Sequence, residues 1–108
     1  MKHSTQPTPP DTATHPSFVN DIVERVSDKK ADLVTVYDVQ HSSSLTSFVI
    51  VVTANNEIHL NALLADIRSY YKDTQTDRSD LDPFRLSGNA NSGWVVVDMN
   101  DVLIHIIF

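Results

Sequence analysis

The feature that most constrains the fold is the end of the chain, residues 94–108, where two apolar runs flank a short polar turn. The runs are rich in Val and Ile, which suit a pleated backbone, and Asn100-Asp101 tolerates the positive φ of a tight hairpin. We therefore predict strands at Trp94–Met99 and Val102–Phe108. Because neither strand alternates cleanly between apolar and polar residues, both faces of this hairpin should be covered, inside a sheet packed by helices.

The segments upstream carry the patterns of two helices and three strands. The predicted elements are a helix from Ser17 to about Lys30, strands at Leu33–Val39 and Phe48–Thr53, a helix from Glu57 to about Lys72, and a short edge strand at Phe84–Leu86. The segment Gly88–Gly93 should be a loop that leads into the hairpin. Because a helix lies between strands, the order αββαβββ favours an α/β fold, with helices packed on a mixed sheet, over a sandwich.

Length and local composition set the domain organisation. A chain of 108 residues allows one domain with a single core. The segment from Met1 to His15 contains three prolines and lacks the spacing of aliphatic residues that helices and strands show. It can therefore bury too little apolar surface to offset the conformational entropy lost on ordering. We predict a disordered tail at residues 1–16 and a folded domain at residues 17–108.

The net charge and the composition of the chain limit the kinds of molecule that it can bind. The net charge of -6 and the pI near 5.0 argue against DNA and fit a basic protein, although an acidic surface that serves only solubility is an equal alternative. The chain has no cysteine, which excludes disulfides and thiolate-bound zinc. No secretory signal and no apolar run of about 18 residues is present, so we expect a cytoplasmic protein without a membrane span.

Two polar stretches invite a catalytic interpretation. Asp38, His41 and the serines at 42–44 contain hydrolase residue types, but no G-x-S-x-G motif accompanies them and a serine-rich turn is the simpler interpretation. Asp80 and Asp82, two residues apart, could share Mg²⁺ for nucleotidyl transfer. Pro83 follows at once, and no glycine precedes Leu86 to cradle a phosphate. We therefore expect a solvated acidic turn, and no catalytic residue, metal or cofactor.

The polar and aromatic residues of the terminal hairpin are the other candidates. Trp94 is the only tryptophan; core packing is its favoured role, and an interface anchor is the alternative. Asp98 and Asp101 flank the turn, where they are either solvated or, beside Trp94, able to bind a basic partner. His105, in an apolar strand and without a spaced second histidine, should be a hydrogen-bonded core residue rather than a metal ligand.

The residues of this hairpin are also where the chain resembles a known family, the Iojap-like ribosomal silencing factors. The strongest match is Trp94–His105, and the resemblance covers about Phe18–Phe108. Further matching residues are Asp38-Val39, Ser44-Leu45-Thr46, Thr53, His59 and Gly88. The chain departs from the family at Ser47, where an acid is usual, and at Ala54 and Asn100, where glycine is usual.

The resemblance implies a nucleotidyltransferase-like fold that has lost catalysis. It implies binding to the large ribosomal subunit through ribosomal protein L-fourteen, which blocks subunit association and represses translation. Trp94 would then be the apolar anchor of the interface, and Asp98 and Asp101 would pair with basic side chains of the partner. Family members continue into a C-terminal helix, so residues 17–108 are expected to form an Iojap-like domain that lacks it.

Two alternatives to a ribosome-binding repressor stay open at this point. One is a Mg²⁺-dependent nucleotidyltransferase that uses Asp80 and Asp82. The other is a small homodimeric interaction module, in which the uncovered last strand of one copy pairs edge to edge with that of a second copy.

Overall fold

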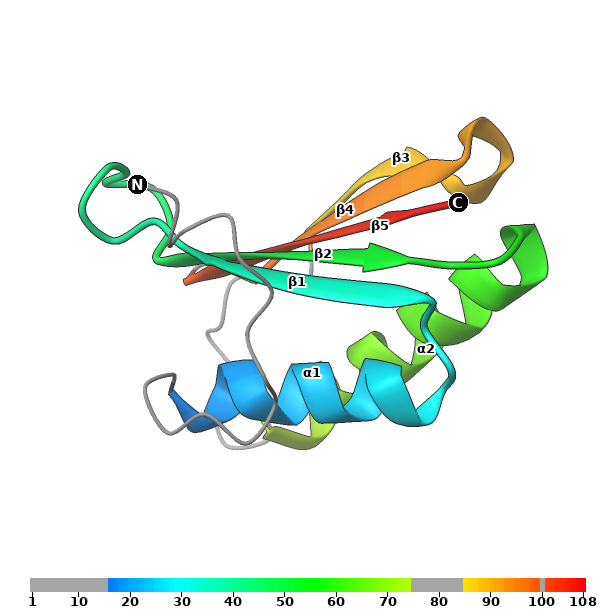
Figure 1. Cartoon of the computed structure of the whole chain (residues 1–108), viewed down its shortest axis with the longest axis horizontal. Helices are drawn as coiled ribbons and strands as arrows, with labels where there is room; N and C mark the ends of the chain where they lie inside the picture. Colours follow the sequence, from blue (N-terminus) through cyan, green and yellow to red (C-terminus); the bar gives the residue numbers. More distant parts are fainter. Residues whose placement is uncertain (1–15, 75–84, 100) are drawn as a thin grey trace.

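The structure, a computed structural model, describes residues 16–74, 85–99 and 101–108. Two α-helices lie against one face of a five-stranded sheet (Figure 1). The predicted α/β class and the order αββαβββ are confirmed. The elements are α1 (Ser17–Asp28), β1 (Leu33–Asp38), β2 (Phe48–Thr53), α2 (Glu57–Thr74), β3 (Arg85–Asn89), the 3-10 turn η2 (Ala90–Ser92), β4 (Trp94–Asp98) and β5 (Val102–Ile107).

The last strand lies in the middle of the sheet. The strand order is β1-β2-β5-β4-β3, with β2 and β5 parallel and the other neighbours antiparallel. Both hydrogen-bonding edges of β5 are therefore occupied, by β2 and by β4. The prediction that the last strand could pair edge to edge with a second copy is wrong, because β1 and β3 are the edge strands.

The short edge strand is longer than predicted. Phe84–Leu86 was the expected extent, whereas β3 runs from Arg85 to Asn89 and takes Gly88 into the sheet. The loop expected at Gly88–Gly93 shrinks to η2 and Gly93, because Gly88 and Asn89 pair with Val95 and Trp94.

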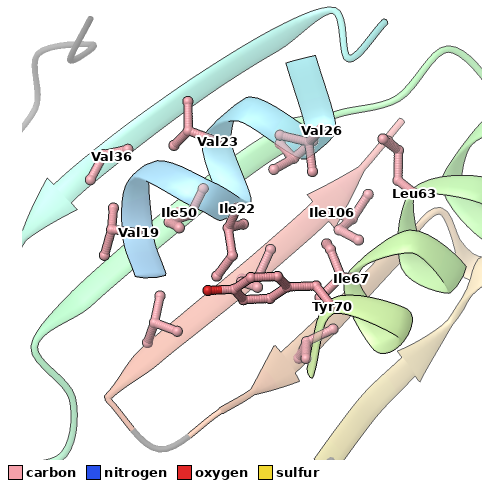
Figure 2. Close-up of a cluster of buried hydrophobic side chains, with 14 of the residues drawn as sticks. Val19, Ile22, Val23, Val26, Val36, Ile50, Leu63, Ile67, Tyr70 and Ile106 are labelled. Atoms are coloured by element: carbon pink, nitrogen blue, oxygen red, sulfur yellow. The ribbon is translucent and has the colours of Figure 1, made fainter. Parts of the chain in front are cut away.

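The hydrophobic core lies between the sheet and the two helices. Side chains from α1, α2 and the covered face of the sheet converge there, as Figure 2 shows for Ile22, Ile67 and Ile106. Each such side chain contributes roughly 1.5–3 kcal/mol by leaving water. The fully buried members are Val19, Ile22, Val26, Ile50, Val52, Leu60, Leu63, Ile67, Val97, Ile104 and Ile106.

Local hydrogen bonds define where α1 ends and α2 begins. The N–H groups of Ala31 and Lys30 donate to the carbonyls of Val26 and Ser27, with Lys30 in the left-handed region at φ 69°, which closes α1 with a Schellman motif. His59 of α2 ties the two helix ends together. Its Nδ1 accepts the N–H of Asn55 at 2.9 Å, and its Nε2 lies 2.7 Å from the carbonyl oxygen of Lys29.

Only one face of the sheet is covered. In the described part of the chain, α1 and α2 both lie on the same side, and no element lies over the other (Figure 1). The expectation that both faces of the terminal hairpin would be covered is therefore wrong. Burial alternates along the hairpin strands, with Val95 and Val97 buried and Val96 only half-buried. The uninterrupted Val and Ile runs thus supply a core on one face and an apolar surface on the other.

Candidate functional site

The candidate site is the uncovered face of the sheet, which we call the open face. Strand register aligns its residues in three rows that cross all five strands from β1 to β3. The rows are Leu33, Thr53, Ile107, Trp94 and Asn89; then Thr35, Val51, His105, Val96 and Ser87; then Tyr37, Val49, Leu103, Asp98 and Arg85.

Large exposed apolar side chains gather in the first of these rows. Leu33 is 57% exposed, Trp94 44% and Ile107 40%. Phe108, which lies just beyond the end of β5 and outside the row, is 49% exposed. Trp94 and Ile107 are direct neighbours in this row, whereas Thr53 separates Leu33 from Ile107. Scattered single apolar residues are normal on a protein surface, but large exposed ones that lie side by side are typical of an interaction site. This row is the apolar part of the candidate site.

Trp94 is the last apolar residue of this row, next to Asn89 at the sheet edge, and a short connection with local hydrogen bonds holds it there. The side chain of Asn89 accepts the N–H of Ser92 at 3.0 Å, and Gly93 in the left-handed region turns the chain into β4. The N–H of Phe108 donates to the Gly93 carbonyl at 3.1 Å, which joins this turn to the end of β5. The favoured prediction of a core Trp94 is wrong, because the buried positions of β4 are Val95 and Val97.

The two acids of the candidate site lie away from Trp94. Asp98 is four residues further along β4 on the same face, so about 13 Å separates the two Cα atoms. Asp101 is exposed in the turn beyond the strand, and its backbone carbonyl accepts the N–H groups of Ser47 and Phe48. Trp94 and Asp98 thus share a face, but the three residues do not form the compact cluster that sequence proximity suggested.

His105 lies in the centre of the open face, between Val51 and Val96 in the register of the sheet. It is half-buried, whereas its neighbours Ile104 and Ile106 are fully buried on the helix side. The prediction that His105 is a core residue is therefore wrong. The alternation of side chains along a strand, which exposes Trp94, also places His105 on the open face.

The polar residues of the β1–β2 loop support its own turns. The Asp38 carboxylate accepts the backbone N–H and the side-chain amide of Gln40, both at 3.1 Å, and the Ser43 hydroxyl accepts the N–H of Leu45 at 3.1 Å. These are the local bonds of Asx and serine turns. The arrangement fits the turn interpretation of this stretch better than a hydrolase site.

The second catalytic candidate, Asp80 and Asp82, lies outside the described residues. Across residues 16–74, 85–99 and 101–108, no three side chains of His, Asp or Glu gather closely enough to hold a metal ion. Neither described helix is long and apolar enough to cross a membrane.

Two of the departures from the family pattern have a structural account. Ala54 is buried and does not have positive φ, so this backbone position does not require glycine. Ser47 contributes a backbone N–H to the Asp101 carbonyl, a bond that any residue except proline can make. The third departure, Asn100, lies outside the described residues.

Sequence reasoning missed the part of the site that lies outside the hairpin. Leu33 follows the first helix by only a few residues, yet the sheet places it in the same row as Trp94 and Ile107. No local signal could have found it, because the row needs the parallel pairing of β2 with β5, which no local pattern reveals.

Comparisons with solved structures agree with this fold. A protein from Chromobacterium violaceum superimposes with a TM-score of 0.73 at 23% identity, covering 85% of this chain and 72% of that one. A protein from Bacillus halodurans gives a TM-score of 0.71 at 23% identity, covering 84% and 80%. At this level of identity the likeness shows a shared fold.

Sequence comparisons show the family. The ribosomal silencing factor RsfS of Halalkalibacterium halodurans is 25% identical over 84 residues, and that of Bacillus subtilis is 23% identical over 79 residues. These alignments cover 78% and 73% of this chain but only 68% and 63% of the relatives, so the chain spans about two thirds of their length. The family profile described as "Ribosomal silencing factor during starvation" matches residues 12–108. Because that match includes the whole described fold, the chain belongs to the family of ribosomal silencing factors.

Proposed function

We propose that this chain acts in the cytoplasm as a translation repressor that binds the large ribosomal subunit through ribosomal protein L-fourteen and blocks subunit association. Family membership supports the ribosomal role. The observation that carries the proposed docking site is the open face, where Trp94 and Ile107 are exposed side by side and Leu33 is exposed in the same row.

The chemistry of the open face suits a basic protein with an apolar contact point. Tryptophan is enriched among residues that dominate binding energy, and a half-exposed indole can be buried further on docking. Asp98 and Asp101 are the acidic residues of this region, on a chain whose net charge is -6, which favours encounter with a basic surface. Asp98 lies opposite Arg85 in the register, so Asp101 in the exposed turn is the more available of the two carboxylates. Blocking a second subunit is a steric effect, so this function requires no catalytic group.

Sedimentation with purified subunits tests the proposal. The protein should migrate with the large subunit and stay at the top of the gradient with the small subunit alone. Addition of the protein should also reduce formation of the joined ribosome. Failure to migrate with either subunit, or a preference for the small one, would contradict the proposal.

Trp94→Ala tests the docking site within that experiment. We expect binding to weaken by tenfold or more, since truncation of a central interface tryptophan typically costs about 2 kcal/mol or more. Ile58→Ala is the matched control, because Ile58 is 81% exposed but belongs to α2 on the other side of the sheet. Equal binding by the two variants would remove Trp94 from the interface.

A second copy of the chain is the other occupant that the exposed apolar row favours. A face-to-face dimer would bury Leu33, Trp94 and Ile107 without using a strand edge. Sedimentation equilibrium decides this: a dimer mass that reverts to monomer in Trp94→Ala supports the dimer, and a monomer mass for the unaltered protein contradicts it.

A further inference from the structure

The indole of Trp94 leans over Gly88, which lies on the neighbouring edge strand β3. A Cβ atom at Gly88 would lie 2.6 Å from Cζ3 and 2.7 Å from Cε3 of the indole, and 2.7 Å from the backbone oxygen of Trp94. Carbon atoms in favourable contact are about 3.5–4.0 Å apart, so a side chain at this position cannot coexist with the observed ring. The ring occupies the space that only glycine leaves open.

The indole therefore crosses from its own strand toward the edge of the sheet. In the register, Trp94 lies between Ile107 of β5 and Asn89 of β3, and Gly88 lies opposite the next residue, Val95. Gly88 is thus offset by one residue from Asn89, the direct partner of Trp94, and in a regular ladder it would share the face of Val95. The indole reaches the Gly88 backbone across the strand, as the short distances to the added Cβ atom show. Because Trp94 is still 44% exposed, the contact with β3 leaves much of the indole open to a partner.

Core packing does not explain the glycine at this position. All five residues of β3 are exposed, so no buried contact requires a small residue there. The backbone gives one reason, because Gly88 has φ +81° in the left-handed region. Gly93 has the same requirement at φ +89°, but a Cβ atom there would meet Phe108 only at 3.9 Å, an ordinary contact. The two glycines therefore differ in what an added side chain would meet across the sheet, which is the indole at Gly88 and Phe108 at Gly93.

We propose that Gly88 is a positioning residue of the docking surface, which seats the indole of Trp94 against the β3 backbone and so presents it in one orientation before the partner binds. The identity of the partner, a basic ribosomal protein, rests on the proposed function. The contact between the indole and the Gly88 backbone, which we call the seat, is a property of the free chain. A side chain that is already ordered loses less conformational freedom on binding, which favours affinity.

The free protein offers a direct test, because Trp94 is the only tryptophan and the intrinsic fluorescence therefore reports on it alone. Gly88→Ala should shift the emission to longer wavelength and increase quenching by acrylamide, since the ring must leave its seat. Ser87→Ala is the control on the same exposed strand: it adds no atom near the indole and should leave emission and quenching close to those of the unaltered protein. A folded Gly88→Ala variant with unchanged emission and quenching would overturn the proposal.

A double-mutant cycle keeps the test decisive if Gly88→Ala folds poorly. If the introduced methyl group collides with the indole, Gly88→Ala should lower the midpoint of urea unfolding less in a Trp94→Ala background than in the unaltered chain. Equal shifts in both backgrounds would show that the ring is not what Gly88 accommodates, and would overturn the proposal.

Binding to the large subunit tests the consequence for function. Gly88→Ala should weaken binding in the unaltered chain and cause no further loss in the Trp94→Ala background, because its effect acts through the indole. Undiminished binding by a Gly88→Ala variant whose indole has moved would overturn the positioning role. If the unaltered protein does not bind the large subunit, the proposed function fails, while fluorescence and the unfolding cycle still decide the seat.

Discussion

Tyr70 shows how one side chain joins the two helices across the core. Its ring is 7% exposed and reaches from α2 toward α1, where its hydroxyl donates to a carboxylate oxygen of Asp21 at 3.1 Å (Figure 2). The guanidinium carbon of Arg25 lies 5.3 Å from the ring centroid, and Arg25 also pairs with Asp66 at 3.2 Å. The Arg25–Asp66 pair is partly solvated and contributes at most about 1 kcal/mol, so burial of the ring dominates this contact.

The buried hydroxyl makes stability depend on pH in the alkaline range. Burial, together with the charge and hydrogen bond of Asp21, raises the pKa of Tyr70 from 10.0 to about 12. The folded state therefore favours the neutral phenol. The neutral Tyr70 phenol stabilises the folded state fully below pH 10, and this stabilisation is lost as the pH rises toward 12, because Tyr70 of the unfolded chain ionises first.

We predict that the free energy of unfolding falls between pH 10 and 12, with a contribution from Tyr70 of up to about 1.4 kcal/mol per pH unit. Tyr70→Phe should lose this contribution, and should cost about 1 kcal/mol at pH 7 through the lost hydrogen bond. Urea unfolding of both proteins at pH 8, 10 and 11 measures the difference. If the free energy of unfolding of the two proteins depended on pH in the same way, the ionisation of Tyr70 would not be the cause of the predicted loss of stability.

At the scale of the element, β4 contributes alternate residues to the core and to the open face. Val95 and Val97 are buried under the helices, while Trp94, Val96 and Asp98 belong to the open face. The strand thus serves folding with alternate residues and the proposed function with the others. This alternation follows from the two-residue repeat of a pleated strand.

The neighbouring residues Val96 and Val97 allow the same substitution on opposite faces. Val97→Ala should destabilise the fold by about 2 kcal/mol, because it leaves a cavity in the core, and should leave binding by the folded fraction unchanged. Val96→Ala should cost less than about 1 kcal/mol and weaken binding to the large subunit. Urea unfolding and subunit sedimentation measure the two effects; a larger stability loss for Val96→Ala would contradict the assignment of faces.

At the scale of the whole molecule, the described residues form a two-layer fold in which none of them covers the second face of the sheet, and the chain carries a net charge of -6. Such a molecule can dock by its sheet without moving any helix. In the proposed complex the charge would act at longer range than the apolar residues of the open face, and it would steer encounter with a basic partner more than it would hold the complex together.

Asp101→Asn should therefore slow association with the large subunit and reduce its dependence on salt, with little change in dissociation. Asp28→Asn is the matched control, because Asp28 also carries an exposed carboxylate but ends α1 on the helix side. Surface plasmon resonance at two salt concentrations measures both rates. Equal slowing by the two variants would show that only net charge matters, and no change in either would exclude steering through Asp101.

The bounds of the elements were predictable because their signals are local. The strand at Phe48–Thr53 was predicted with the observed bounds, and the predictions for the first helix and for the strands of the hairpin differ from the structure by at most two residues. β-Branched runs and helical spacing depend on neighbours a few positions away. The edge strand β3 was less predictable, because its exposed residues carry no apolar pattern and its Gly88 was interpreted as part of a loop.

The sequence by itself determined the family, the α/β class and the identity of the hairpin that carries Trp94. Only the tertiary structure decided that both helices lie on one face, that β5 pairs with β2 and β4, and that Leu33 joins the row of Trp94. The physical reason is that a Val or Ile run satisfies a strand equally well whether its second face meets a helix or solvent. Which face is covered depends on contacts between segments far apart in the chain, and these contacts placed Trp94 and His105 on the surface rather than in the core.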